Sequence, residues 1–276
     1  MPTHAEKCQT FREMHERTGL FVMPNPWDVG SARILESLGF EAVATTSSGF
    51  AFAQGRLDYE MGRDAVLEHC RTLVAATSVP VSADLENGFG DDPQTAAETI
   101  RLAAETGLAG GSIEDSTGPP VNSIYEQALA VERIRAAAET VRQLPVPFVL
   151  TARCENYLHQ RPDLSDTIRR LQAYQDAGAD VLYAPAIKSP EDIATLVRSV
   201  DRPVNVLMGM PGMNLSVAQL ATMGVKRITV GSALARAAIG GFLRAAREIR
   251  ENGTFHFNDE AAPSKEINAL LDRSPR

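Results

Sequence analysis

The chain has 276 residues, 44% of them hydrophobic, which is enough to bury a substantial core in one large domain or two smaller ones. Its net charge is −8 and no block of Lys or Arg exceeds a dipeptide, which argues against nucleic acid or an anionic membrane as a partner. The polar N-terminus does not resemble a signal peptide, and no run approaches the roughly 18 apolar residues of a membrane span, so we expect a cytoplasmic protein. Three scattered cysteines argue against a disulfide framework or a cysteine zinc site.

An N-terminal helix is expected over residues 4 to 18, ahead of the first strand. Short β-rich runs then alternate with longer helical patterns, several of which begin at a capping residue and end in Gly. The phrases SLGFEAV, TGLAGGS, AGADVLY and MGVKRIT each repeat one construction, helix then Gly then strand. Eight β-rich runs occur: LFVMPN, EAVATTS, VPVSADLE, GGSIED, PFVLTARCE, DVLYAPAI, RPVNVLM and KRITVGS.

Eight such units predict an α/β fold of the (β/α)8 TIM-barrel type rather than an open doubly wound sheet. No G-x-G-x-x-G or G-x-x-x-x-G-K phosphate motif follows any run, which weakens the nucleotide-binding alternative. Residues 1–276 are therefore interpreted as a single barrel domain. A helical tail follows Gly253, with a last helix around Ser264 to Leu271, and we interpret 254–276 as an oligomerisation tail.

Acidic residues and one arginine stand where predicted strands end. Asp84 and Glu86 close the third run, Glu114 the fourth, and Arg153 the fifth, followed by Glu155. Because active sites of TIM barrels gather at the C-terminal ends of the strands, these side chains should meet at one mouth and form a metal site. For Asp115 and Glu155, capping a helix or pairing with a neighbour is the favoured interpretation.

These motifs, taken in order, resemble the isocitrate lyase and phosphoenolpyruvate mutase superfamily of magnesium-dependent barrels. The resemblance extends to the members similar to carboxyvinyl-carboxyphosphonate phosphorylmutase that lack a loop cysteine. The matching pieces cover roughly residues 20 to 185: PNPWD, ATTSSGFAFAQGRLD, SADLENGFG, IEDS, NS, TAR and AGAD.

The resemblance implies a Mg2+ cofactor, with Mn2+ as the alternative, held directly or through water by four acids, of which Asp84 is the direct ligand. It also implies that Ser48 and Gly49 bind the substrate's carboxylate and keto oxygen through backbone amides, and that Arg153 binds a carboxylate. The four implied metal acids are Asp58, Asp84, Glu86 and Glu114.

Mg2+ needs only one or two carboxylates besides water and substrate oxygens. Breaking a bond at C3 of a 2-oxo acid leaves an enolate, whose negative charge a Lewis-acid metal and backbone amides can stabilise. An arginine can clamp the substrate carboxylate with two parallel hydrogen bonds.

Departures from the superfamily pattern narrow the activity. Where isocitrate and methylisocitrate lyases carry a K-[KR]-C-G-H loop, this chain reads DSTGPPVNSIYE, so the proton-transfer cysteine is missing. Phosphonate enzymes carry a lysine and then Asn-Ser; here Asn122 and Ser123 are kept but Pro120 replaces the lysine. Pro185 replaces a polar residue of several relatives, which leaves Tyr183 as the nearest acid or base.

Because the loop cysteine and lysine are missing, we expect a reaction that does not require a strong protein base. We expect a Mg2+-dependent carbon–carbon lyase or decarboxylase that acts on a small 2-oxo or 2-hydroxy dicarboxylate, similar to oxaloacetate or methylisocitrate, through a metal-stabilised enolate. Arg153, Asn122, Ser123 and Tyr183 are the candidate catalytic residues. One alternative is carbon–phosphorus chemistry on phosphonopyruvate or phosphoenolpyruvate, by a mutase or hydrolase. Another is a barrel that binds a 2-oxo acid without turning it over.

The tail also predicts assembly. The helix ALARAAIGGFLRAAREIREN, which precedes the tail, is rich in Ala and Gly, and the tail residues that follow add apolar side chains beyond what one barrel needs. Members of the superfamily exchange this helix between subunits, so we expect a homo-oligomer, a homotetramer built as a dimer of dimers.

Overall fold

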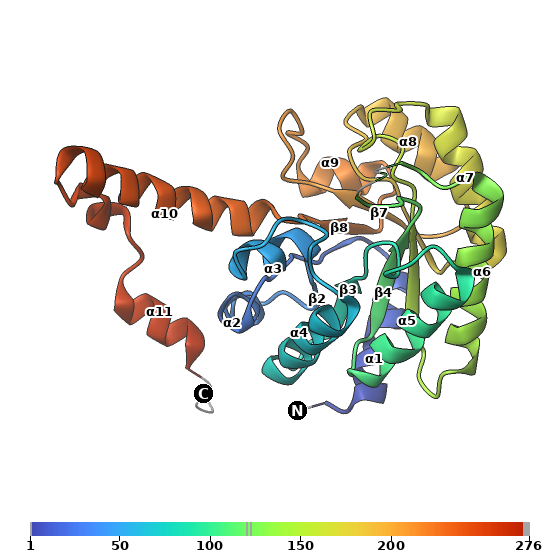
Figure 1. Cartoon of the computed structure of the whole chain (residues 1–276), viewed down its shortest axis with the longest axis horizontal. Helices are drawn as coiled ribbons and strands as arrows, with labels where there is room; N and C mark the ends of the chain where they lie inside the picture. The colour runs from blue at the N-terminus through green and yellow to red at the C-terminus, as the bar shows by residue number, and fades with distance from the viewer. Residues whose placement is uncertain (1, 120, 122, 273–276) are drawn as a thin grey trace.

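The computed structural model describes residues 2–119, 121 and 123–272 (Figure 1). Every one of the eight β-rich runs contains a strand, and the longest has five residues. The strands are β1 (Phe21–Val22), β2 (Val43–Ala44), β3 (Val81–Asp84), β4 (Gly110–Glu114), β5 (Val149–Arg153), β6 (Val181–Tyr183), β7 (Val204–Leu207) and β8 (Arg227–Thr229).

All strand pairs are parallel, in the order β1-β8-β7-β6-β5-β4-β3-β2. The two end strands approach each other just beyond their last residues, where the Ala44 N–H donates to the Pro24 carbonyl over 3.0 Å. Asn25 strengthens this join, because its amide donates to the Thr45 carbonyl (2.8 Å) and accepts from the Val230 and Gly231 N–H groups. The prediction of a TIM-barrel fold is confirmed.

Helices alternate with the strands and cover the outside of the sheet (Figure 1). Several begin where the sequence places a capping side chain: Asp92, Asp163, Ser189 and Ser216 each accept a hydrogen bond from an N–H of the first turn. The helices are α1 (His4–Glu16), α2 (Val29–Ser37), α3 (Ser47–Ala53), α4 (Arg63–Ala76), α5 (Pro93–Glu105), α6 (Gln127–Gln143), α7 (Leu164–Ala177), α8 (Pro190–Arg198), α9 (Val217–Thr222), α10 (Ala233–Asn252) and α11 (Ser264–Leu271), with a 3-10 turn at His256–Glu260.

The N-terminal helix α1 closes the bottom of the barrel. Phe11 and Met14 pack in one buried cluster with Phe21, Val149 and Val181, which begin β1, β5 and β6. His15 lies edge-on to Phe11 and Phe21, and its Nδ1 lies 2.8 Å from the Phe11 carbonyl. Because this end is sealed, the barrel interior can open only at the C-terminal ends of the strands.

His15 should make the fold sensitive to acid. Burial, together with the Arg227 charge, lowers the pKa of its imidazole to about 3 from an ordinary value near 6.5. The unfolded chain therefore binds a proton below pH 6.5 that the folded chain refuses, so stability is lost as pH falls from 6.5 towards 3. We expect His15→Gln to flatten the pH dependence of the urea unfolding free energy in this window by up to about 1.4 kcal/mol per pH unit. An unchanged slope would contradict a buried neutral His15.

The C-terminal segment leaves the barrel. Helix α10 extends away from the strands, and α11 lies back beside α2 (Figure 1). Ala235 is the one buried residue of α10, while Phe242 is 70% exposed. Among the described residues, no helix is both long and apolar enough to cross a membrane.

Candidate active site at the barrel mouth

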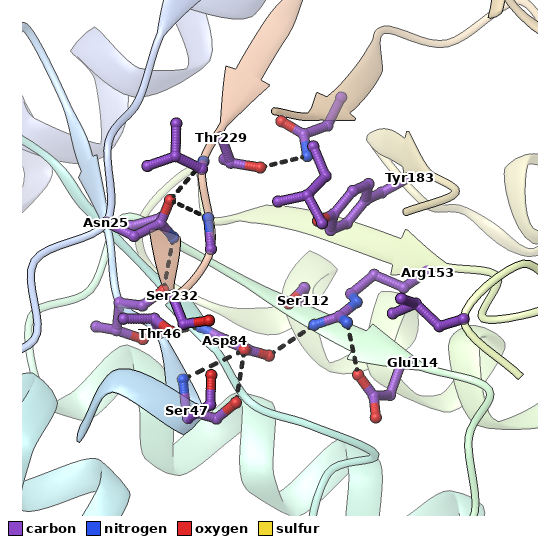
Figure 2. A pocket seen from close by; sticks show the side chains of 18 of the residues that line it. Asn25, Thr46, Ser47, Asp84, Ser112, Glu114, Arg153, Tyr183, Thr229 and Ser232 are labelled. Atoms are coloured by element: carbon purple, nitrogen blue, oxygen red, sulfur yellow. Dashed lines mark hydrogen bonds and ion pairs between the residues drawn. The ribbon is translucent and has the colours of Figure 1, made fainter. Parts of the chain in front are cut away.

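A cavity of about 350 Å³ opens at the C-terminal ends of the strands (Figure 2). Its polar side is formed by the ends of β3, β4 and β5 and by the first turn of α3, and its outer rim carries the apolar side chains of Leu158, Met210 and Pro211. The predicted site residues that line it are Ser48, Asp58, Asp84, Glu114, Arg153 and Tyr183.

The guanidinium of Arg153 lies between the carboxylates of Asp84 and Glu114 (Figure 2). Its guanidinium contacts three carboxylates, Asp84 at 2.8 Å, Glu155 at 2.9 Å and Glu114 at 3.0 Å. Burial acts to lower the pKa of Arg153, but the neighbouring acids outweigh it and raise that pKa well above its ordinary value. The guanidinium is therefore a fixed positive charge held by side chains from three neighbouring strand ends.

Asp84 joins this cation to helix α3. Its Oδ2 accepts from the Ser47 hydroxyl (2.9 Å) and the Ser47 N–H (3.3 Å), while its Oδ1 accepts from Arg153 (Figure 2). Its backbone N–H donates to Thr45 Oγ1 over 2.9 Å, which fixes the end of β3 against the end of β2. Ser47 was not among the predicted site residues, although it stands next to Ser48.

Two further acids approach Asp84. Burial and the Asp84 charge raise the pKa of Asp58, whose carboxylate accepts from the Tyr59 N–H at 3.2 Å. Burial, Asp84 and Asp58 raise the pKa of Glu86 to about 8. Glu86 has a left-handed backbone with φ of 50°, and its side chain borders a neighbouring cavity beyond β3 rather than the main one. Like charges thus crowd together with Arg153 as their nearest cation.

Glu114 has a partner that the strand-end pattern did not indicate. Tyr59, also left-handed with φ of 64°, reaches from the loop after α3 and donates its hydroxyl to Glu114 over 2.5 Å. Burial and the Glu114 charge raise the pKa of Tyr59, so it remains a phenol and a donor. Glu114 is therefore held by Tyr59 and Arg153 together.

These residues suit a hard divalent cation. The buried Oε1 of Glu86 has no hydrogen-bond partner among the described residues, and Asp58, Asp84 and Glu86 all present oxygen ligands. No three His, Cys, Asp or Glu side chains in the described part of the chain converge as a complete metal site. Mg2+ does not need one, since it keeps several waters and takes one or two carboxylates. Asp84, with Asp58 and Glu86 around it, fits that ion.

Two backbone N–H groups in the first turn of α3 already donate hydrogen bonds within the protein. The Gly49 N–H donates to the capping Thr46 Oγ1 at 3.2 Å, and the Ser47 N–H donates to Asp84. Ser48 lines the cavity, and its N–H belongs to the first helical turn, where amides have no partner within the helix. Of the two amides that the resemblance implied, that of Ser48 remains the candidate donor to a ligand.

Tyr183 forms the wall beside Arg153, whose guanidinium lies 5.2 Å from the centre of its ring. Burial raises the pKa of Tyr183, and Arg153 opposes that rise. The phenol is therefore protonated at neutral pH and can serve as a hydrogen-bond or proton donor.

The loop after β4 is only partly described. Asn122 and Pro120 lie outside the described residues. Ser123 is exposed, and its backbone pairs with Thr117, so it lies outside the main cavity in this conformation.

Asp115 and Glu155 were interpreted as structural acids. Asp115 is buried, contacts Arg170 and accepts from the Tyr174 hydroxyl (2.6 Å) and the Glu155 N–H (2.7 Å), which agrees with that interpretation. Glu155 also lines the cavity and holds Arg153, so it supports the site directly.

Comparison with known proteins identifies the family. The phosphoenolpyruvate phosphomutase family model matches residues 11–250. A crystal structure from Burkholderia cenocepacia J2315, provisionally described as a lyase/mutase, is 58% identical with a TM-score of 0.95, over 98% of this chain and 97% of that one. Phosphonopyruvate hydrolase of Variovorax sp. (strain Pal2) is 28% identical over 86% of this chain and 84% of its own length.

Other matching proteins have other activities. A structure of oxaloacetate acetylhydrolase with its product oxalate has a TM-score of 0.87 at 24% identity, over 98% of this chain and 95% of that one, which shows the shared fold. Several 2-methylisocitrate lyases, including that of Escherichia coli (strain K12), also match. The chain belongs to the phosphoenolpyruvate phosphomutase family, within the superfamily of isocitrate lyases and phosphoenolpyruvate mutases.

Proposed function

We propose that the protein is a Mg2+-dependent carbon–carbon lyase or decarboxylase that acts on a small 2-oxo or 2-hydroxy dicarboxylate. The observation that carries this proposal is the cluster of carboxylates around Arg153 and Asp84 at the barrel mouth. Such a cluster is costly to bury until a cation joins it, and the substrate's own oxygens can complete the coordination of that cation.

Asp84, Asp58 and Glu86 would hold the ion, and Glu114 would support it through water. Mg2+ or Mn2+ would supply positive charge for the oxygen that becomes negative as the enolate forms. The Ser48 amide, in the first turn of α3 at the cavity wall, would donate to that oxygen. Arg153 would exchange one of its acidic partners for the substrate carboxylate, which would fix the orientation of the scissile bond.

The proposed reaction type follows from the residues that are missing in the loop after β4. Residues 115–126 lack the cysteine and the lysine of the related enzymes, and Asp115, which begins this segment, is already paired with Arg170 and Tyr174. Decarboxylation of a 3-carboxy-2-oxo acid needs only enolate stabilisation and then a proton at C3, which the Tyr183 phenol or water can give.

Substitution of Arg153 tests this assignment. We expect Arg153→Met to lower kcat/KM for Mg2+-dependent oxaloacetate decarboxylation by roughly a hundredfold or more, and Arg153→Lys to restore part of the loss, because Arg153 would hold the substrate carboxylate that fixes the orientation of the scissile bond. Carbon dioxide release measures the rate, and circular dichroism checks the fold. Exposed Arg135→Met on α6 is the matched control. Activity that is equal in folded Arg153→Met and in the unaltered enzyme would reject the role of Arg153.

The second candidate is carbon–phosphorus cleavage of phosphonopyruvate. Similarity to phosphonopyruvate hydrolase over most of the chain favours it, as do Asn122 and Ser123 in the loop after β4. Pro120 in place of the lysine disfavours it, because a phosphoryl group in transfer would lose a neighbouring cation.

A further inference from the structure

The cavity continues below the mouth into the barrel. Ala44, Ser82 and Ser112 line this deeper part, and their small side chains leave room that larger ones would fill. Arg227, the first residue of β8, also lines it and is only 3% exposed. Thr229 of the same strand lines the cavity two residues further on, so Arg227 lies about 7 Å deeper along the strand.

Arg227 is held by neutral groups. Its Nε donates to Asn205 Oδ1 at 3.0 Å, and its Nη2 donates to Thr151 Oγ1 at 3.0 Å. The third contact is His15 Nε2 at 3.2 Å, which must accept, because the lowered pKa of His15 keeps the imidazole neutral and its Nδ1–H faces the Phe11 carbonyl. Three of its five N–H groups are thus used, and two remain.

No carboxylate of residues 2–119, 121 and 123–272 forms an ion pair with Arg227. The other buried arginine at the site differs, because Arg153 contacts three acids. Burial without a counter-ion lowers the pKa of Arg227 to about 10, which still leaves it charged at neutral pH. A buried charge of this kind is costly unless an anion accompanies it.

We propose that Arg227 forms an anion subsite at the floor of the cavity and that this subsite binds the second carboxylate of a dicarboxylate substrate. The proposal deepens the proposed function, on which it rests, by adding a charge requirement at the end of the substrate away from Arg153. The Arg227 guanidinium could also bind a free small anion such as chloride. The experiments must therefore distinguish a substrate carboxylate from a free anion.

Paired ligands of matched shape test the subsite without turnover. We expect the intact protein with Mg2+ to bind succinate roughly tenfold or more tightly than butyrate in calorimetry, because only succinate carries a second carboxylate. Arg227→Gln should remove this preference, and Arg227→Lys should keep part of it. Arg135→Gln on the exposed face of α6 should leave it unchanged. A folded Arg227→Gln protein that still prefers succinate to the original extent would overturn the proposal.

Asn205→Asp gives an independent variant that changes few atoms. It places a carboxylate on the Arg227 Nε–H and supplies the missing counter-ion from within the protein. We expect a higher melting temperature without ligand, because the buried charge is paired, and loss of the preference for succinate, because the subsite is neutralised. Retention of the full preference for succinate in Asn205→Asp would count against an anion subsite at Arg227.

A bromide experiment distinguishes whether the Arg227 subsite binds the substrate carboxylate or a free anion. Anomalous diffraction from bromide-soaked crystals should show an ion beside Arg227 that succinate displaces. Bromide that stays in place when succinate is bound would assign the subsite to a free anion and overturn the substrate role. If no candidate compound is turned over while the Arg227-dependent preference for succinate persists, the proposed function fails and the subsite stands.

Discussion

Asp84→Ala should weaken Mg2+ binding by roughly a hundredfold or more, beyond the effect expected of residues that only support a metal ligand. Asp84 is the acid that contacts both Arg153 and Ser47, and its charge raises the pKa of both Asp58 and Glu86. Removing it would delete the oxygen ligand that we propose as the direct one and would leave Arg153 to neutralise the remaining acids. Calorimetric titration with Mg2+ at pH 7 measures the change.

Asp58→Ala provides a second variant whose effect on Mg2+ binding can be compared with that of Asp84→Ala. Asp58 lies at the edge of the cluster, so its removal should weaken Mg2+ binding less than removal of Asp84 does. Asp64→Ala serves as the control, because the side chain of Asp64 is 97% exposed and belongs to no ion cluster at the mouth. If Asp84→Ala bound Mg2+ as tightly as the unaltered protein, the assignment of the metal ligand would be wrong.

Truncation after Gly253 should break the assembly that we propose for this chain. Helix α10 leaves its own barrel and exposes a row of apolar side chains, among them Phe242 at 70% and Leu243 at 41%. The truncation keeps α10 but removes further exposed apolar side chains, Phe255 at 65% and Ile267 at 38%. Apolar surface of this extent on a projecting helix is typical of a subunit contact. We expect light scattering to give a tetramer for the intact protein and a smaller species for the truncated one.

Phe242→Glu tests the part of the proposed contact that the truncation leaves in place, because Phe242 belongs to α10. It should lower the mass measured by light scattering, because it places a charge on the most exposed apolar position of α10. Leu129→Glu on α6 is the matched control, since Leu129 is also exposed, at 37%, but belongs to the barrel wall. An intact protein that is monomeric, or an assembly unchanged by the truncation, would rule out this role for the tail.

Most of the fold could be predicted because it depends on periodicity and on local signals. All eight strands lie within the β-rich runs, and α11 occupies the expected Ser264–Leu271. The helix predicted over residues 4 to 18 ends at Glu16, where Arg17 is already extended. Where α10 and α11 lie relative to the barrel could not be predicted, because it depends on surface contacts rather than on a repeating pattern.

The site was predictable only where side chains follow strand ends. Asp84, Glu114 and Arg153 meet as expected, because parallel strands bring their C-terminal ends to one mouth. Tyr59 was not predicted as a site residue, because it reaches the mouth from a loop rather than from a strand end. Arg227 was not predicted either, because it is the first residue of a strand and lines the barrel interior, where a charged side chain was not expected.

Product analysis by NMR tests the central claim most directly. The intact protein should be incubated with and without Mg2+ in the presence of oxaloacetate, methylisocitrate, dimethylmalate or phosphonopyruvate, with chelator-treated protein as the control. We predict Mg2+-dependent conversion of at least one of the three carbon-only acids, with cleavage of a carbon–carbon bond and no reaction in chelator. Conversion of phosphonopyruvate alone, or binding of these acids without conversion of any, would contradict the proposal.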